Sequence, residues 1–86
     1  MASPEAIARA QSVNAKYENE LMRKRNVVGV GVGLRERAGR PTDAVCIVVS
    51  VSVKLPRNQL AAKDIIPNEL EGVPVDVKAT GTFRAL

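Results

Sequence analysis

The fold of this chain is decided by the stretch Val27-Val28-Gly29-Val30-Gly31-Val32-Gly33-Leu34, which alternates with a period of two. The apolar side chains at positions 28, 30, 32 and 34 share one face, and the three glycines share the other. A period of two predicts a β-strand and not a helix. Glycine inside a strand costs conformational entropy and packs against nothing, so we expect another backbone to approach this bare face.

A second alternating stretch, residues 44–53, predicts the partner of the glycine strand. It has a bulky face and a small face: the bulky face carries Val45, Ile47, Val49, Val51 and Val53, and the small face carries Ala44, Cys46, Val48, Ser50 and Ser52. The polar connection 35–43 contains glycine and proline, which mark a turn, so the two strands should form a long antiparallel hairpin. Matching the bulky faces sets the register and places Gly29, Gly31 and Gly33 beside Ser50, Val48 and Cys46.

Start and stop signals predict the remaining elements. Ser3-Pro4-Glu5 is typical of a helix N-terminus, and the helix should run to about Lys24. Its apolar stripe consists of Ala6, Ala10, Val13, Tyr17 and Leu21. Asn26 can adopt the left-handed conformation that ends a helix. A short helix is expected over residues 57–63, and the last strand over residues 72–79, in which Pro74 suggests an edge position.

These elements predict an α+β fold in the order α-β-β-α-β. The sheet should have three strands, be mainly antiparallel and follow the spatial order 2-1-3, with the last strand beside the glycine strand. Both helices should cover the bulky face. An alternative places the alanine-rich first helix on the glycine face. We expect a single domain over residues 1–79 and a tail or linker over residues 80–86.

Composition excludes several classes of protein. The chain has 86 residues, enough for one domain, and a net charge of +4. Only 2% of its residues are aromatic, so the core should be aliphatic, and a base-stacking surface for single-stranded nucleic acid is disfavoured. No apolar run is long enough to cross a membrane, and the N-terminus lacks the pattern of a secretory signal. With a single cysteine there is no disulfide framework, and a cytoplasmic location is expected.

Residues for catalysis, metal binding or cofactor binding are not expected in this chain. It contains no histidine, which excludes a Ser-His-Asp or Cys-His arrangement within the chain. The aspartates and glutamates are scattered, without the spacing of a calcium or magnesium site. The glycines lie inside a strand, whereas a dinucleotide site needs them at the start of a helix. We therefore predict that the chain is not an enzyme.

Two sets of residues are candidates for binding a partner. The first is the small face of the hairpin: Gly29, Gly31, Gly33, Cys46, Val48, Ser50 and Ser52. The second is a set of candidate anion contacts: Arg23, Lys24, Arg25, Arg35, Arg37 and Arg40. Simpler interpretations remain open for both sets. In these interpretations the small residues only fill space in a strand, and the triplet at 23–25 only interacts with the helix dipole. The arginines of the connection would then be solvated side chains without a partner molecule.

Several segments of the chain resemble a known family. The motif Asn26-Val27-Val28-Gly29-Val30-Gly31-Val32-Gly33 is similar to the opening of the small N-terminal region of certain bacterial trypsin-like proteases. Further similarity lies in Val48-Val49-Ser50-Val51-Ser52-Val53-Lys54-Leu55-Pro56, in Ile66-Pro67 and in Glu71-Gly72-Val73-Pro74-Val75-Asp76-Val77. The resemblance implies that catalytic residues belong to a protease domain following this region, so none is carried onto this chain.

The sequence thus predicts a non-enzymatic accessory or interaction domain that resembles a pro-domain. Its expected partner is a second copy of the chain or an adjacent protease domain. Binding to a membrane is not expected. If the middle strand of the order 2-1-3 is the glycine strand, the second strand is an edge and the expected seam between copies. The alternative is a small basic nucleic-acid-binding module, whose binding would weaken steeply with salt.

Overall fold

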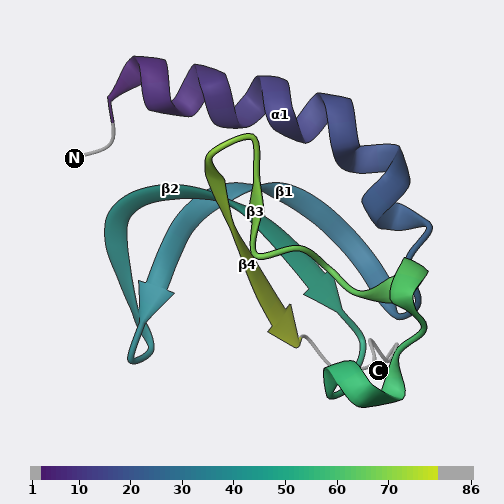
Figure 1. The fold of residues 1–86 in the computed structure, drawn as a ribbon. Helices are drawn as coiled ribbons and strands as arrows, with labels where there is room; N and C mark the ends of the chain where they lie inside the picture. The colour runs from purple at the N-terminus through teal and green to yellow at the C-terminus, as the bar shows by residue number, and fades with distance from the viewer. Residues whose placement is uncertain (1–2, 80–86) are drawn as a thin grey trace, which may run out of the picture.

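The computed structural model describes residues 3–79 and shows one long helix lying across the convex side of a curved sheet (Figure 1). The elements are α1 (Pro4–Met22), β1 (Val27–Arg37), β2 (Arg40–Val51), the 3-10 turns η1 (Arg57–Gln59) and η2 (Ala62–Asp64), β3 (Glu69–Leu70) and β4 (Val73–Ala79). The tail predicted over residues 80–86 lies outside the described residues.

Helix α1 begins as the sequence predicts. The Ser3 hydroxyl oxygen accepts a hydrogen bond from the Ala6 amide at 3.1 Å, and Pro4 occupies the first turn. The helix ends at Met22, two residues before the predicted Lys24, and Asn26 takes the predicted left-handed conformation with φ of 69°. Between residues 3 and 79, no helix combines the length and the apolar character needed to cross a bilayer.

The hairpin of β1 and β2 has the predicted register. Gly29, Gly31 and Gly33 pair with Ser50, Val48 and Cys46, in that order. The connection is a two-residue turn in which Ala38 has φ of 51° and Gly39 has φ of 76°. Positive φ at both central residues is the geometry of a type I′ turn, whose twist matches that of the strands it joins.

The predicted strand order is wrong. The sheet has four strands in the order β1-β2-β4-β3, so β2 is central and β1 lies at an edge. Strand β4 pairs parallel with β2, from Ile47 opposite Val75 to Val51 opposite Ala79. The reason is the burial of β2: Cys46 on one face and Ile47 on the other are both fully buried. A strand covered on both faces occupies the middle of a sheet, where neighbours satisfy its backbone on both sides.

The predicted second helix is also wrong. The segment after Pro56 forms two separate 3-10 turns, because Ala61 between them is extended, with ψ of 152°. The chain then forms β3, which pairs antiparallel with the start of β4. Pro74 lies in this start, before β4 joins β2 at Val75, so its missing N–H does not interrupt the central ladder.

The core lies between α1 and the bulky face of the sheet, as predicted for the first helix. It consists of Ala10, Val13, Leu21, Ile47, Val49, Val51 and Val73. Tyr17, Val30 and Ile66 are partly buried and pack against this cluster. The alternative in which α1 covers the glycine face is therefore wrong, because the buried stripe of the helix contacts the opposite side of β2.

A polar cluster fastens the middle of α1 to the turn between β3 and β4. The Arg9 guanidinium donates a hydrogen bond to the Glu71 carbonyl oxygen at 2.5 Å. Tyr17 donates its hydroxyl to the Glu71 carboxylate at 2.8 Å, and the Lys16 ammonium lies 2.8 Å from the same oxygen. Hydrogen bonds from Lys16 and Tyr17 lower the pKa of Glu71 below its ordinary value of 4.5. The cluster joins residues far apart in the sequence.

Candidate interaction surface

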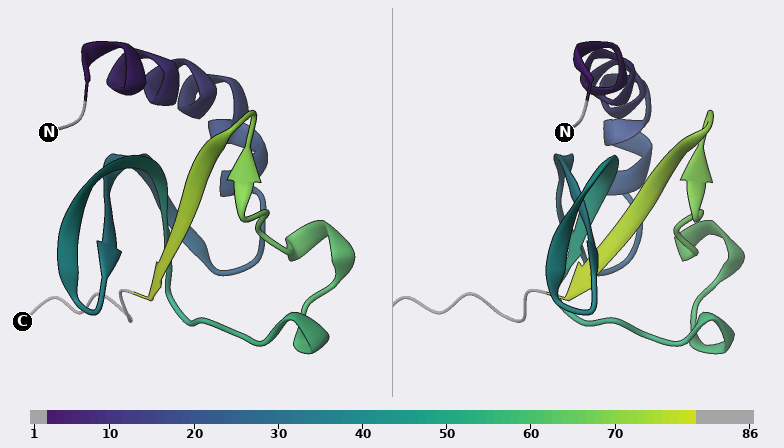
Figure 2. Two further views of the ribbon diagram at one scale, coloured as in Figure 1. Left: turned by 60° about the vertical axis from the view of Figure 1, so that its left-hand side comes forward. Right: turned by 90° about the vertical axis from the view of Figure 1, so that its left-hand side faces the viewer.

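The side of the sheet away from α1 is concave (Figures 1 and 2). Since Val30 packs against the core on the helix side, alternation places the glycines of β1 on the concave side. We call the surface formed by Gly29, Gly31, Gly33, Val48 and Ser50 the glycine face. It forms because alternation between the two register shifts of β1 sends Val30, Val32 and Leu34 toward the helix side and leaves the glycines on the other. Small residues suit a concave surface, since side chains on the inside of a curved sheet converge.

The three glycines differ in what surrounds them. A Cβ placed on Gly33 would lie 3.0 Å from the Val48 Cγ2 atom, and one placed on Gly29 would lie 3.7 Å from the Ser50 Cβ atom. A Cβ on Gly31 would meet no heavy atom of the described residues within 4 Å. Packing inside the domain therefore explains Gly33, whereas nothing described within the domain requires Gly31 to be glycine.

A polar bridge crosses from β4 to the far end of β1. The Lys78 ammonium is bonded to the Glu36 carboxylate, and the Glu36 amide donates to the Asp76 carboxylate at 3.4 Å. The hydrogen bond that Lys78 donates to the Glu36 carboxylate raises the pKa of Lys78. Cys46, one of the predicted interaction residues, is fully buried, and burial raises the pKa of its thiol with a further contribution from Asp76. Cys46 is therefore a buried packing residue beside Gly33, and its side chain is not exposed on the glycine face.

The last predicted interaction residue, Ser52, lies beyond the end of β2. Its amide donates to the Asn26 carbonyl oxygen at 2.8 Å. This bond continues the β1–β2 pairing by one step at the start of β1. The backbone of Ser52 therefore has a structural role at the edge of the glycine face.

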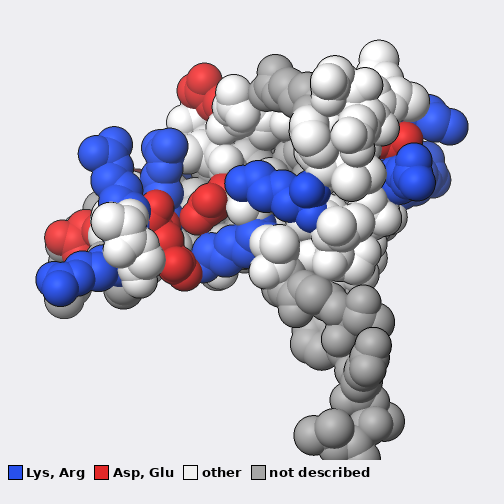
Figure 3. Space-filling model, turned by 90° about the horizontal axis from the view of Figure 1, so that it is seen from below, with Lys and Arg blue, Asp and Glu red and all other residues white. Residues whose placement is uncertain are grey.

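The predicted anion contacts form two separate groups. Arg35, Arg37 and Arg40 are exposed around the turn of the β1–β2 hairpin. The other three, residues 23–25, follow the end of α1, where the Lys24 ammonium donates to the Lys63 carbonyl oxygen at 2.7 Å and the Arg25 amide donates to Asp64 at 3.0 Å. The two groups lie at opposite ends of β1, so they do not form one patch. In Figure 3, Lys and Arg side chains are spread across the face seen from below, with Asp and Glu among them.

The sequence interpretation missed the free edge of β1. Within the described sheet β1 pairs only with β2, so its other edge has no neighbouring strand there. The side chains of Val28, Val32 and Leu34 are 45%, 36% and 44% exposed. A signal was present, because the apolar run of β2 is typical of a central strand, whereas the glycines of β1 are not.

Beside this edge lies a cavity of about 270 Å³, lined by Ile7, Gln11, Val32, Gly33, Leu34 and Val45.

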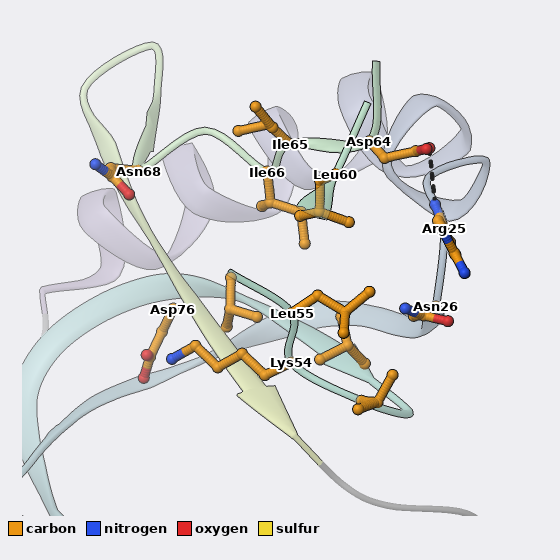
Figure 4. Close-up of a pocket in the computed structure, with 13 residues that line it drawn as sticks. Arg25, Asn26, Lys54, Leu55, Leu60, Asp64, Ile65, Ile66, Asn68 and Asp76 are labelled. Atoms are coloured by element: carbon orange, nitrogen blue, oxygen red, sulfur yellow. Dashed lines mark hydrogen bonds between the residues drawn. The ribbon is translucent and has the colours of Figure 1, made fainter. Parts of the chain in front are cut away.

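A second cavity, of about 240 Å³, lies between the segment carrying the 3-10 turns and the ends of β2 and β4 (Figure 4). Leu55, Leu60 and Ile66 give it an apolar wall, and the bond from Arg25 to Asp64 borders it. Its lining contains no serine, cysteine or histidine, so it lacks the side chains of a Ser-His or Cys-His nucleophile. Nor do the residues between 3 and 79 include a group of three potential metal ligands.

Comparison with known proteins identifies a related family. The family model described as NARROW LEAF 1 N-terminal domain matches residues 11–80, which cover α1 from its eighth residue onward, the hairpin, the 3-10 turns, β3 and β4. Among curated proteins no match was found.

Proposed function

Since this chain belongs to the NARROW LEAF 1 N-terminal domain family, we propose that it is a non-enzymatic interaction domain that docks on a trypsin-like protease domain. NARROW LEAF 1 is a trypsin-like protease family member of plants, which agrees with the protease resemblance of the sequence and corrects its bacterial assignment. The absence of histidine from the chain supports a non-enzymatic role.

The observation that carries this proposal is the open space above Gly31. Glycine in a strand interior costs about 0.5–1 kcal/mol relative to alanine, and a Cβ at this position would meet no heavy atom of the described residues within 4 Å. Close approach of a partner backbone would account for a glycine here, because glycine is the residue that lets another chain come nearest. The glycine face is therefore the proposed docking surface.

The shape of this surface favours a different protein over a second copy. The glycine face lies on the concave side of the sheet, and two concave surfaces cannot touch along their floors (Figure 2). A convex surface on another domain fits a concave one. We therefore favour a protease domain over a second copy of the chain as the partner that binds this face.

Replacing Gly31 with valine tests the proposal. The variant should stay folded, since a Cβ at residue 31 meets no described heavy atom within 4 Å and valine favours strands. It should bind a trypsin-like domain of the NARROW LEAF 1 family at least about tenfold more weakly than the wild type, because two methyl groups block the backbone approach. Titration calorimetry measures the affinity, and Ala15→Val, on the exposed side of α1, is the matched control.

Three results would contradict this proposal. Unchanged binding by Gly31→Val would show that the glycine face is not the contact. A dimer of the isolated chain that Gly31→Val dissociates would make a second copy the partner. Casein hydrolysis that follows the chain through purification, and that a substitution in it abolishes, would make it an enzyme.

A further inference from the structure

We propose that the free edge of β1 binds an extended peptide in which an alternating apolar stretch is flanked by acidic residues. The peptide would add a strand to the sheet, next to β1 and opposite β2. This site differs from the glycine face, because it uses the edge of β1 and the helix side of the sheet. It would stand even if the proposed docking on a protease domain failed.

The middle of β1 lacks the features that protect edge strands. Soluble proteins block exposed edges with proline, lysine, bulges or very short strands. Strand β1 has eleven residues, and its register shifts fall near its two ends, between Val27 and Gly29 and between Leu34 and Glu36. From Val28 to Leu34 there is neither a proline nor a charged residue. An added strand could pair with this stretch without removing any described hydrogen bond.

Apolar side chains beside the edge provide a site for those of the peptide. On the helix side, Val28, Val32 and Leu34 are partly exposed along the strand, and Ile7 of α1 is 39% exposed next to them. The cavity of about 270 Å³ opens between Ile7 and Leu34. Alternate side chains of an added strand point to this side, so one aliphatic side chain can enter the cavity while its neighbours cover the valines.

Positive charge at both ends of β1 selects acidic flanks. Arg23, Lys24 and Arg25 precede the strand, and Arg35 and Arg37 end it. The carboxylate of Glu36, which lies between these two arginines in the sequence, is bonded to Lys78. Carboxylates before and after the apolar stretch of a peptide would lie near these cations.

The same charges argue against a second copy of the chain as the occupant of the edge. Two β1 strands paired antiparallel about Gly31 would bring Arg37 of one copy beside Arg25 of the other, at both ends of the pair. A parallel pair would bring the same cations side by side. Like charges directly opposite each other destabilise strand pairing, so an acidic partner fits where a copy does not.

A labelled peptide tests the proposal directly. The probe is a fluorescein-tagged 12-mer, Asp-Glu-Thr-Val-Thr-Val-Ser-Val-Thr-Val-Glu-Asp, titrated with the 86-residue chain and followed by fluorescence anisotropy. We expect saturable binding, and hydrogen exchange should show protection of the β1 amides between residues 28 and 34. Two control peptides separate the contributions of strand pairing and of charge. In one, both residues of the Ser-Val pair are proline; in the other, all four acidic residues are glutamine.

Substitutions in the protein locate the contact. Leu34→Gln should weaken binding about fivefold, whereas Val53→Gln, at 48% exposure beyond the end of β2, should not change it. The double variant Arg35→Gln/Arg37→Gln should weaken binding about tenfold at low salt. The pair Lys54→Gln/Lys63→Gln removes the same charge from residues that belong neither to β1 nor to its hairpin turn, and serves as its control.

Several outcomes would overturn the inference. Equal binding of the proline peptide would exclude strand addition, because proline cannot pair across a ladder. Equal binding of the glutamine peptide would exclude the role of charge. Competition by single-stranded DNA of equal charge at the same concentration would show a general anion site, and a dimer with protected β1 amides would make a second copy the occupant. Failure of the 12-mer to bind at millimolar concentration would also reject the proposal.

Discussion

At the level of single residues, the glycines of β1 show that one repeated residue type can have different causes. At Gly33 a Cβ would press against the Val48 side chain, whereas at Gly31 it would meet no described heavy atom within 4 Å. The sequence placed all three correctly beside their partners on β2, because alternation fixes which face each residue shares. It could not separate their roles, since the distance from a backbone to its neighbour is not encoded in alternation.

Alanine substitution should therefore act oppositely at these two glycines. Gly31→Ala should raise the free energy of unfolding by about 0.5–1 kcal/mol, because alanine reduces the entropy of the unfolded chain at no steric cost. Gly33→Ala should bring no gain, or a loss, since Val48 must move away from a Cβ at 3.0 Å. Thermal melts of both variants measure the difference. Equal shifts would show that Val48 relaxes freely.

At the level of elements, the hairpin was predictable and the position of β4 was not. Two long alternating strands joined by a polar turn have one register that keeps their bulky faces together. The short valine-rich β4 matches either neighbour by alternation alone, so its pattern does not choose between β1 and β2. The choice depends on which strand is buried on both faces. The fully buried Cys46, Ile47 and Val49 make that strand β2.

The turn of the same hairpin carries an unfavourable residue. Ala38 has φ of 51°, a conformation that costs a residue with a Cβ about 1–2 kcal/mol unless it is asparagine or aspartate. Ala38→Asn should raise the free energy of unfolding by about 1 kcal/mol, because asparagine suits the first position of a type I′ turn. Ala38→Val should lower it, since β-branching is poorly tolerated there. Urea denaturation of the two variants checks both signs, and equal midpoints would contradict the prediction.

At the level of the whole molecule, the cluster around Glu71 makes stability depend on pH. The folded-state pKa of Glu71 lies below its ordinary value of 4.5, so its contribution is present above that value and is lost as the pH falls through the folded pKa. Hydrogen bonding to Glu71 raises the pKa values of Lys16 and Tyr17, so their contributions are lost as the pH rises through their folded values on the alkaline side.

The variant Glu71→Gln should therefore have a flatter profile of melting temperature against pH. The difference from the wild type should be greatest near neutral pH and should shrink below pH 4. Because the cluster is exposed to solvent, 1 M salt should reduce the effect. Glu69→Gln removes a nearby charge outside the cluster and is the control. A parallel downward shift at every pH would contradict the assignment.

The parallel pairing of β2 with β4 has a consequence for folding during synthesis. Residues 52–72 separate the two strands, and contacts of Arg9 and Tyr17 with Glu71 span 62 and 54 positions of the sequence. As the chain leaves the ribosome, α1 and the hairpin can form from local contacts, but β2 keeps an open second edge until residue 79 has emerged. The nascent domain therefore exposes its most apolar strand until β4 has been made, and it is during this interval that a chaperone would be needed.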